Sequence, residues 1–440
     1  MNMFFTNIEA MSQLEIITRI LNWTILASFI ICFVYMAIFF FAKFRSWKPA
    51  VKSTTQNRFA VLIAARNEAA VLGNLLDSIH AQNYDQSMID IYVVADNCTD
   101  HTATVARNHG AICFERFNDV KKGKSYVLEY IIGKLQKSGD FYNYDGFMIF
   151  DADNLLDPDF FQEINNTFCM GYDVVTGYRN SQNLTANWIS YGYGLWFMHE
   201  AGFRNRGRML TGTSCMVAGT GYVISRKVLE QRNGWNWHLL TEDIEFTADC
   251  ILHDVKIGYN EKAVFYDEQP ISLAASFTQR IRWVKGYLQV FTRYGRKLLS
   301  KAFRKHSLSA YDMQMSYVPA FFITIYAVLV HVVLLTVGIT HSMDMSFTVF
   351  SCFMLPFKTY LTLLAFGIYT FICEHEHMPR IGLKHLLYLL MFPIYMFTYF
   401  PIAILAIFKK AQWKPITHGN TTGSDAKKDY DLHTSVNRTA

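Results

Sequence analysis

Four long apolar segments constrain this chain more than any other feature of its sequence. The first covers residues 23–42 and carries no charge, and about twenty such residues suffice to cross the hydrocarbon core of a bilayer. Three more lie at residues 318–337, 347–372 and 386–408. Buried core helices are the alternative, but they are rarely this long and apolar. We therefore expect an N-terminal membrane helix within residues 1–52 and three membrane segments within residues 316–410.

Basic residues indicate how these segments are oriented. They follow the first and last segments: Lys43, Arg45, Lys48 and Lys52, then Lys409, Lys410 and Lys414. The positive-inside rule predicts a multi-pass protein of the plasma (inner) membrane whose central domain is cytoplasmic. Three spans after that domain would put the C-terminus outside, whereas the last lysines indicate inside. Either the tail breaks the charge rule or one segment is re-entrant, and the middle segment is interrupted by Pro356 and Lys358.

Composition excludes two classes of site. The net charge is +5 without a dense run of Lys and Arg, so we expect no nucleic-acid partner. None of the eight cysteines forms a CxxC or a Cys/His pair at metal-ligand spacing. They indicate reduced thiols in a cytosolic domain. The 51% hydrophobic content fits a chain that is partly membrane-embedded and partly soluble.

Residues 53–270 have the pattern of one α/β domain. Apolar runs of strand length at 59–65, 89–95, 111–114 and 147–150 alternate with helical patterns at 71–79, 99–108, 124–135 and 158–168. This alternation predicts a parallel sheet with crossover helices, which binds ligands beyond the carboxyl ends of its strands. Asp96 and Asp151 each directly follow a strand, so we expect both carboxylates at one rim.

Asp151 and Asp153 form a candidate cation site at a predicted strand end. Mg²⁺ or Mn²⁺ prefers oxygen ligands, commonly one or two carboxylates together with phosphates. A solvated turn is the alternative, because Asp-x-Asp-Asn is ordinary loop chemistry. Asp96 has a similar alternative as a helix cap.

Thr241, Glu242 and Asp243 precede a helical stretch at residues 244–253. Asp243 is a candidate general base, because a partly desolvated carboxylate has the raised pKa that suits proton abstraction from a hydroxyl. Thr241 or Asp243 is equally consistent with a simple helix cap.

Gln279, Arg282 and Trp283 lie in a helical pattern within residues 271–315. Their spacings of three and four place them on one helix face. A guanidinium pairs with phosphate, and an indole stacks on the apolar face of a sugar ring. An amphipathic helix at the membrane interface is the alternative, and both interpretations can hold together.

Two further stretches contain glycines. Residues 188–197 are aromatic and predict an interfacial helix that anchors the domain, with the additional hypothesis that its rings line an acceptor path. Gly219, Thr220 and Gly221 predict a tight turn, in which glycines permit close approach of a ligand.

The order of these motifs resembles the family 2 glycosyltransferases, and among them the membrane-integrated processive synthases of cellulose, chitin, hyaluronan and poly-N-acetylglucosamine. The resemblance covers about residues 59–287 and the flanking spans. It implies a GT-A (Rossmann-like) α/β domain in the cytosol beside a helical transmembrane region. One departure is Ala95, where many members carry a second aspartate beside Asp96.

The resemblance also implies roles for individual residues. Donor-nucleotide contacts fall to Glu68, Asp96, Lys124 and Asp151, and the metal to Asp153. The catalytic base is Asp243, in a motif shared with Glu242. The diphosphate and the acceptor end fall to Gln279, Arg282, Trp283, Gly219, Thr220 and Gly221.

These implications predict an inverting, processive β-glycosyltransferase that uses Mg²⁺ or Mn²⁺ and passes its polysaccharide across the membrane. UDP-glucose is the first candidate donor and UDP-N-acetylglucosamine the second. One alternative is single transfer to a lipid-linked acceptor. Another is a receptor or transporter that only binds nucleotide, which leaves Asp243 unexplained. The polar residues 411–440 are too few for a cyclic-dinucleotide receptor domain, so none is expected. The oligomeric state stays open.

Overall fold

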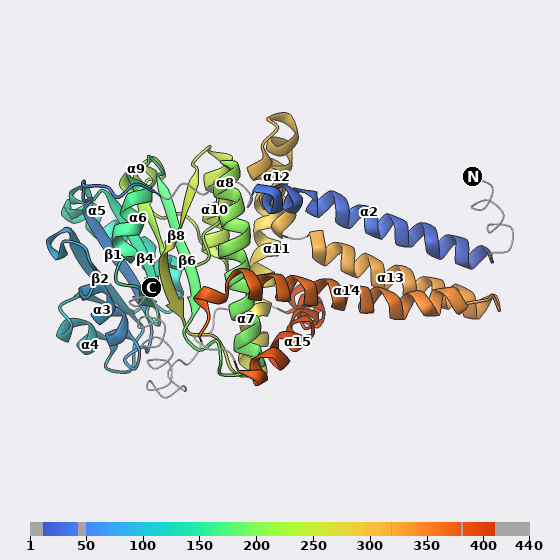
Figure 1. Cartoon of the computed structure of the whole chain (residues 1–440). Coiled ribbons are helices and arrows are strands. Elements are labelled where there is room, and N and C mark those ends of the chain that lie inside the picture. The colour runs from blue at the N-terminus through green and yellow to red at the C-terminus, as the bar shows by residue number, and fades with distance from the viewer. Residues whose placement is uncertain (1–11, 43–49, 318, 380–381, 410–440) are drawn as a thin grey trace.

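The computed structural model describes residues 12–42, 50–317, 319–379 and 382–409 (Figure 1). An α/β domain lies at one end of the molecule, and long helices extend from it toward the other end. Residues 411–440, Lys43, Arg45 and Lys48 therefore fall outside the described part of the chain.

An eight-stranded mixed sheet forms the domain, with the order β3-β2-β1-β4-β7-β6-β8-β5. Its first half is parallel, as predicted, and consists of β1 (Phe59–Ala65), β2 (Ile89–Asp96), β3 (Ile112–Arg116) and β4 (Gly146–Asp151). The register pairs Ala65 with Ala95 and Ala64 with Asp151, so the carboxyl ends of these strands meet at one edge.

Helices cover both faces of this half: α3 (Leu72–His80), α4 (Thr102–Asn108), α5 (Lys124–Ser138) and α6 (Phe160–Phe168). All four were predicted within a few residues. Alternate β1 residues explain the two cores: Ala60 and Leu62 join the cluster that contains α5, while Val61 and Ile63 join the cluster that contains α3 and α6. A strand buried on both faces is therefore a continuous apolar run.

The second half of the sheet is mixed, whereas the first half is parallel. It contains β5 (Leu155–Leu156), β6 (Val174–Ser181), β7 (Tyr222–Ser225) and β8 (Ile257–Asp267). Strand β7 runs antiparallel to both β4 and β6, and β5 runs antiparallel to β8. The central β7 has only four residues, which is too short for a periodic sequence signal.

A layer of helices separates the sheet from the apolar segments. It consists of α7 (Trp188–His199), the π-helical segment η3 (Glu200–Asn205), α8 (Arg206–Thr211), α10 (Glu242–Leu252), α11 (Leu273–Arg304) and α12 (Leu308–Tyr317). The short helix α9 (Arg226–Gln231) and the 3-10 turns η1 (Gln86–Met88), η2 (Asp140–Asn143) and η4 (His375–His377) complete the described domain.

Three long helices run side by side away from the domain: α2 (Gln13–Ala42), α13 (Pro319–Thr340) and α14 (Ser346–Cys373) (Figure 1). Each contains a stretch long and apolar enough to cross a membrane. Polar side chains join them, including Thr18 and Thr348, whose hydroxyl oxygens lie 2.9 Å apart.

The last apolar segment is interrupted at a single residue, whereas the middle one is continuous. Helix α14 continues through Pro356, but the final segment divides at Thr398 into α15 (Leu383–Phe397) and α16 (Tyr399–Phe408). Together they are also long and apolar enough to cross a membrane. However, α15 packs on α7 and α16 packs on α11. The suggested interruption of the middle segment is thus wrong, because a helix interior accommodates Pro356 here.

Candidate active site

A cavity of about 1290 Å³ extends from the sheet edge to the long helices. We call its two regions the sheet end and the membrane end. The sheet end is lined by Glu68, Asp96, Lys124, Asp151, Asp153 and Asp243, and the membrane end by Phe29, Phe33, Ile325, Leu363, Phe366 and Phe400. The structure therefore brings the predicted strand-end motifs into one space, which also reaches α2, α13, α14 and α16.

Asp96 closes the outer side of the sheet end. It is the last residue of β2 and is buried, and it forms an ion pair with Arg116 at the end of β3. It does not cap α4, whose N-cap position is His101. The neighbouring Glu68 lines the same region, and its backbone N–H donates to the hydroxyl of Thr102 at 2.9 Å.

Lys124 connects three parts of the chain. It begins α5 after Gly123, whose φ of +109° favours glycine. Its ammonium group donates to Oδ1 of Asp151 at 2.5 Å and to the carbonyl of Gly219 at 2.7 Å. The basic side chain thereby holds the strand-end carboxylate against the glycine turn.

Thr220 and Gly221 support this wall from behind and do not line the cavity. The Thr220 hydroxyl accepts a hydrogen bond from the backbone N–H of Asp151 at 2.9 Å and donates to Asn154. Gly221 has φ +68°, and a Cβ there would lie 2.2 Å from Phe265. Only Gly219 of this predicted acceptor turn reaches the cavity, because the turn folds back into the sheet.

Arg179 was not predicted and lines the cavity. It forms an ion pair with Asp267 and donates to the carbonyl of Ala218 at 2.7 Å. Its guanidinium lies 3.7 Å from the centre of the Phe197 ring. An arginine inside the strand β6 was the only sequence signal, and it gives no indication of where the side chain points.

Glu242 and Asp243 form the first turn of α10, where carboxylates suit the helix dipole. Burial raises the pKa of Asp243, which the charges of Lys124 and Arg282 oppose. Burial and then the Asp243 charge raise the pKa of Glu242 to about 7. Thr241 occupies the N-cap position but makes no capping hydrogen bond through its side chain. The Asp243 carboxylate accepts a hydrogen bond from the backbone N–H of Ile244 in the first turn, which lowers its pKa, so a capping contact and a role as base can hold together.

Helix α11 approaches this turn closely at Gly286. A Cβ on Gly286 would lie 2.4 Å from the Thr241 hydroxyl oxygen. The absence of a side chain thus lets α11 lie directly against the start of α10. This contact fixes the distance between the acidic turn and the residues that α11 carries.

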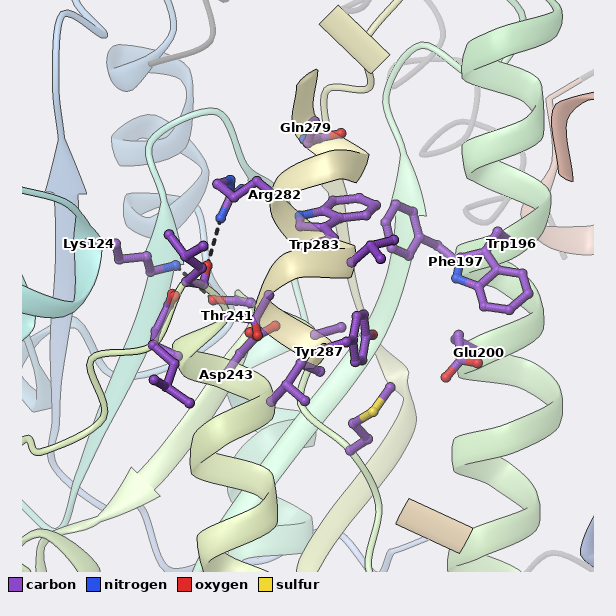
Figure 2. A pocket seen from close by; sticks show the side chains of 18 of the residues that line it. Lys124, Trp196, Phe197, Glu200, Thr241, Asp243, Gln279, Arg282, Trp283 and Tyr287 are labelled. Atoms are coloured by element: carbon purple, nitrogen blue, oxygen red, sulfur yellow. Dashed lines mark hydrogen bonds between the residues drawn. The ribbon is translucent and has the colours of Figure 1, made fainter. Parts of the chain in front are cut away.

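Consecutive residues of α11 point to different regions of the cavity (Figure 2). Arg282 points toward the sheet end and donates to the carbonyl of Leu240 at 3.1 Å. Trp283 points the other way and makes edge-on ring contacts with Tyr193 and Phe197, with centroids 5.8 and 6.1 Å apart. Gln279 also lines the cavity, and its buried Oε1 has no hydrogen-bond partner among the described residues. All three residues therefore line the cavity, and Arg282 and Trp283 contact different regions of it.

The aromatic helix α7 both anchors the domain and lines the cavity. It packs on α15, which agrees with an anchoring role, and Gly192 permits a close approach to Tyr395. Trp196 and Phe197 line the cavity opposite Trp283 (Figure 2). The hypothesis that its rings face the path of a ligand thus agrees with their position.

Asp151 and Asp153 can provide part of a cation site. No group of three or more His, Cys, Asp or Glu side chains able to hold a metal occurs in the described ranges. The Asp151 side chain is 40% exposed, and both carboxylates face the cavity. The two therefore fit a divalent cation whose remaining ligands are oxygens of a bound molecule.

Comparison with known proteins gave a family and several distant relatives. The family model described as "Glycosyltransferase like family 2" matches residues 56–286. Beta-monoglucosyldiacylglycerol synthase of Synechocystis sp. is 25% identical over 242 residues, which are 54% of this chain and 49% of that protein. Poly-beta-1,6-N-acetyl-D-glucosamine synthase of Staphylococcus epidermidis is 24% identical over 272 residues, 58% of this chain and 61% of that protein. The chain thus spans about half to three fifths of these relatives.

A solved structure resembles nearly the whole chain. The mannosyltransferase PcManGT from Pyrobaculum calidifontis, in complex with GDP-Man and Mn²⁺, matches with a TM-score of 0.58. The match covers 90% of this chain and 99% of that one, at 16% sequence identity. This similarity agrees with a GT-A fold flanked by long helices.

Proposed function

The chain belongs to glycosyltransferase family 2, and we propose that it transfers one hexosyl residue from a UDP-sugar to a hydroxyl group of a membrane lipid. The observation that carries this proposal is the single cavity, which joins a charged sheet end to an apolar membrane end. A nucleotide sugar suits the first region and a hydrocarbon chain suits the second.

In the reaction, the acceptor oxygen attacks the anomeric carbon and the bond from that carbon to the diphosphate breaks. The diphosphate leaves with the electron pair, and attack from the opposite face inverts the configuration. Asp243 accepts the hydroxyl proton, since its position in the cavity and its raised pKa suit a general base. Burial raises this pKa, and the charge of Asp243 in turn raises the pKa of the neighbouring Glu242 to about 7.

The donor is bound by the sheet end. Asp96 and Glu68 contact the nucleoside, and Lys124 and Arg282 contact the diphosphate, since both cations line the cavity beside the acidic turn. Asp153, with Asp151, would hold Mg²⁺ or Mn²⁺. A bound divalent cation would neutralise charge that develops on the leaving diphosphate.

The membrane end favours a lipid acceptor over a polymer. Its wall is contributed by Phe29, Phe33, Leu363, Phe366 and Phe400 from three helices. Hydroxyl groups of a long glycan would lose their hydrogen bonds to water along such a wall, whereas an alkyl chain would not. This reverses the order of preference expected from the motifs alone.

Polysaccharide synthesis remains the second candidate because of the aromatic platform. Trp283, Tyr193 and Phe197 form contiguous ring contacts next to the acidic turn. Such rings can stack on a sugar without requiring a particular hydroxyl pattern. UDP-glucose stays the first choice of donor, followed by UDP-N-acetylglucosamine.

The packing of the last segment favours one resolution of the topology conflict. We infer that α2, α13 and α14 cross the membrane, while α15 and α16 lie at its cytoplasmic face against α7 and α11. An even number of spans after the domain then returns Lys409 to the cytoplasm, as the charge rule requires. Buried Arg280 supports this arrangement, since it donates to the Thr398 hydroxyl at the break at 2.7 Å.

A donor screen tests the proposal. Purified protein in phosphatidylcholine vesicles is incubated with single UDP-sugars and Mg²⁺ or Mn²⁺, with and without diacylglycerol, and UDP release is measured. We expect one donor to release UDP faster when the lipid acceptor is present. EDTA should abolish release, and Asp153→Ala should weaken metal-dependent UDP binding. Full activity in EDTA, or no release from any UDP-sugar, would contradict the proposal.

A further inference from the structure

A compact set of buried charges borders the cavity where α7 ends. Glu200 and Arg204 form an ion pair within the π-helical segment η3. Behind them, Arg208 and Asp312 are fully buried and paired, with 2.6 Å between Nε and Oδ2. π-helical turns inside α-helices frequently occur at functional sites.

Glu200 and Arg204 line the cavity, whereas Arg208 and Asp312 do not. The Glu200 and Arg204 side chains are only 9% and 8% exposed. Figure 2 shows Glu200 on the same side as Trp196, opposite Tyr287. The pair is therefore a polar spot within a largely apolar part of the wall.

Each member of the pair retains an unused polar atom. Oε1 of Glu200 accepts from Arg204, but Oε2 has no hydrogen-bond partner among the described residues. The nearest recorded cation, Nη1 of Arg208, lies 3.9 Å from it. Nε of Arg204 is likewise buried without a hydrogen-bond partner in this part of the chain. Native structures rarely leave such groups unsatisfied, so each requires an explanation.

The chemistry of these two atoms defines what satisfies them. A carboxylate oxygen accepts a hydrogen bond and a guanidinium N–H donates one, so a hydroxyl group can serve both. The four charges of Glu200, Arg204, Arg208 and Asp312 sum to zero. The spot thus has no net positive charge with which to hold a phosphate.

The pair also lies within electrostatic reach of the acidic turn. Burial raises the pKa of Tyr287, and the negative charges of Asp243 and Glu200 raise it further. Figure 2 shows Tyr287 between these two carboxylates. A molecule bound at Glu200 and Arg204 is therefore beside the path to Asp243.

We propose that Glu200 and Arg204 bind the hydroxylated, uncharged head group of the acceptor and position it for attack. This inference rests on the proposed function and adds a substrate class, because it favours a neutral hydroxylated acceptor over a lipid phosphate. Glu200 is the specificity-determining residue, and Arg204 holds it in place while donating to the same group.

The test compares acceptors with wild-type protein and two variants in phosphatidylcholine vesicles. The acceptors are diacylglycerol, a soluble cello-oligosaccharide and undecaprenyl phosphate, which separate a neutral lipid, a neutral glycan and a lipid phosphate. Glu200→Gln removes the negative charge. Glu200→Asp keeps the charge, but its shorter side chain moves the carboxylate oxygens back toward the helix. Glu261→Gln is the matched control, since it removes an ion pair of the nearby Arg206 outside the cavity.

We expect wild type to use a neutral acceptor and not undecaprenyl phosphate. Both Glu200 variants should raise the KM for that acceptor roughly tenfold or more, because each loses one hydrogen bond between the acceptor and a charged group. UDP affinity, measured by calorimetry with Mn²⁺, should stay at the wild-type value in all variants. An unchanged acceptor KM in both Glu200 variants overturns the inference alone. A wild-type preference for undecaprenyl phosphate overturns the inference and also contradicts transfer to a lipid hydroxyl group. If wild type transfers sugar to no acceptor, the proposed function fails as well.

Discussion

The two ends of the cavity are built differently. The sheet end takes its side chains from strand ends and the first turns of helices, and charged residues such as Lys124, Asp151 and Asp243 dominate it. The membrane end takes its side chains from the three long helices and the shorter α16, and its wall is mainly apolar. The difference indicates that the chemistry is fixed by the domain, while the choice of acceptor is fixed where domain and membrane helices meet.

The largest expected effect separates chemistry from binding at the sheet end. Asp243→Asn removes the proton acceptor but keeps the shape of the side chain. We expect kcat to fall by roughly 10²–10⁴ while UDP affinity is retained. Asp77→Asn, an exposed aspartate on α3, is the control and should have wild-type kcat. Near-normal turnover of Asp243→Asn would remove the catalytic assignment.

The second prediction tests the contact that joins the two ends. Gly286→Ala places a Cβ within 2.4 Å of the Thr241 hydroxyl and must displace α11 from the acidic turn. A displacement of about 1 Å can cost about 100-fold in rate, so we expect kcat/KM to fall by about that factor. Gly133→Ala in α5 meets no atom within 4 Å and serves as the matched helix control. Equal activity of both variants would show that this contact is unimportant.

The third prediction uses adjacent residues that face opposite ends. Arg282→Ala should weaken UDP-sugar binding roughly 10- to 100-fold, because a charge-assisted contact to the diphosphate is lost. Trp283→Ala should instead raise the KM of the acceptor and leave UDP affinity near the wild-type value. Calorimetry with UDP and steady-state kinetics with varied acceptor distinguish them. If both substitutions change the same parameter, the assignment of Arg282 to the donor and Trp283 to the acceptor is wrong.

The smallest expected effect is a shift in pH dependence. A general base works only when deprotonated, so activity is lost as pH falls through the raised pKa of Asp243. The positive charge of Lys124 lowers the pKa of Asp243, and Lys124→Met removes that charge. The pKa of Asp243 should then rise, and the acid limb of the kcat profile should move to higher pH. A limb that stays in place, or moves to lower pH, would contradict this coupling.

Sequence reasoning succeeded where a motif coincides with a strand end. Residues 59–65 were predicted as a strand and form β1, and Asp96 and Asp151 meet at one edge because parallel strands share their direction. Parallel pairing of the apolar runs made this rim predictable without any knowledge of the rest of the sheet.

Other features depend on tertiary contacts that no local pattern records. Arg179 faces the cavity because of the mixed pairing of β6 with β7 and β8. Glu200 lines it because a π-helical segment follows α7, and the break at Thr398 is stabilised by Arg280 from α11. Spacing along one helix also gives no indication that the adjacent Arg282 and Trp283 contact different parts of the cavity.

The size and solubility of the product test the central claim most directly. Wild-type protein in vesicles is given a radiolabelled UDP-sugar, the reaction is extracted with organic solvent, and the labelled product is measured by mass spectrometry. Transfer to a membrane lipid through the apolar end of the cavity predicts an organic-soluble product that carries a single added hexose. A water-soluble ladder of long chains would contradict the lipid acceptor and establish polysaccharide synthesis instead.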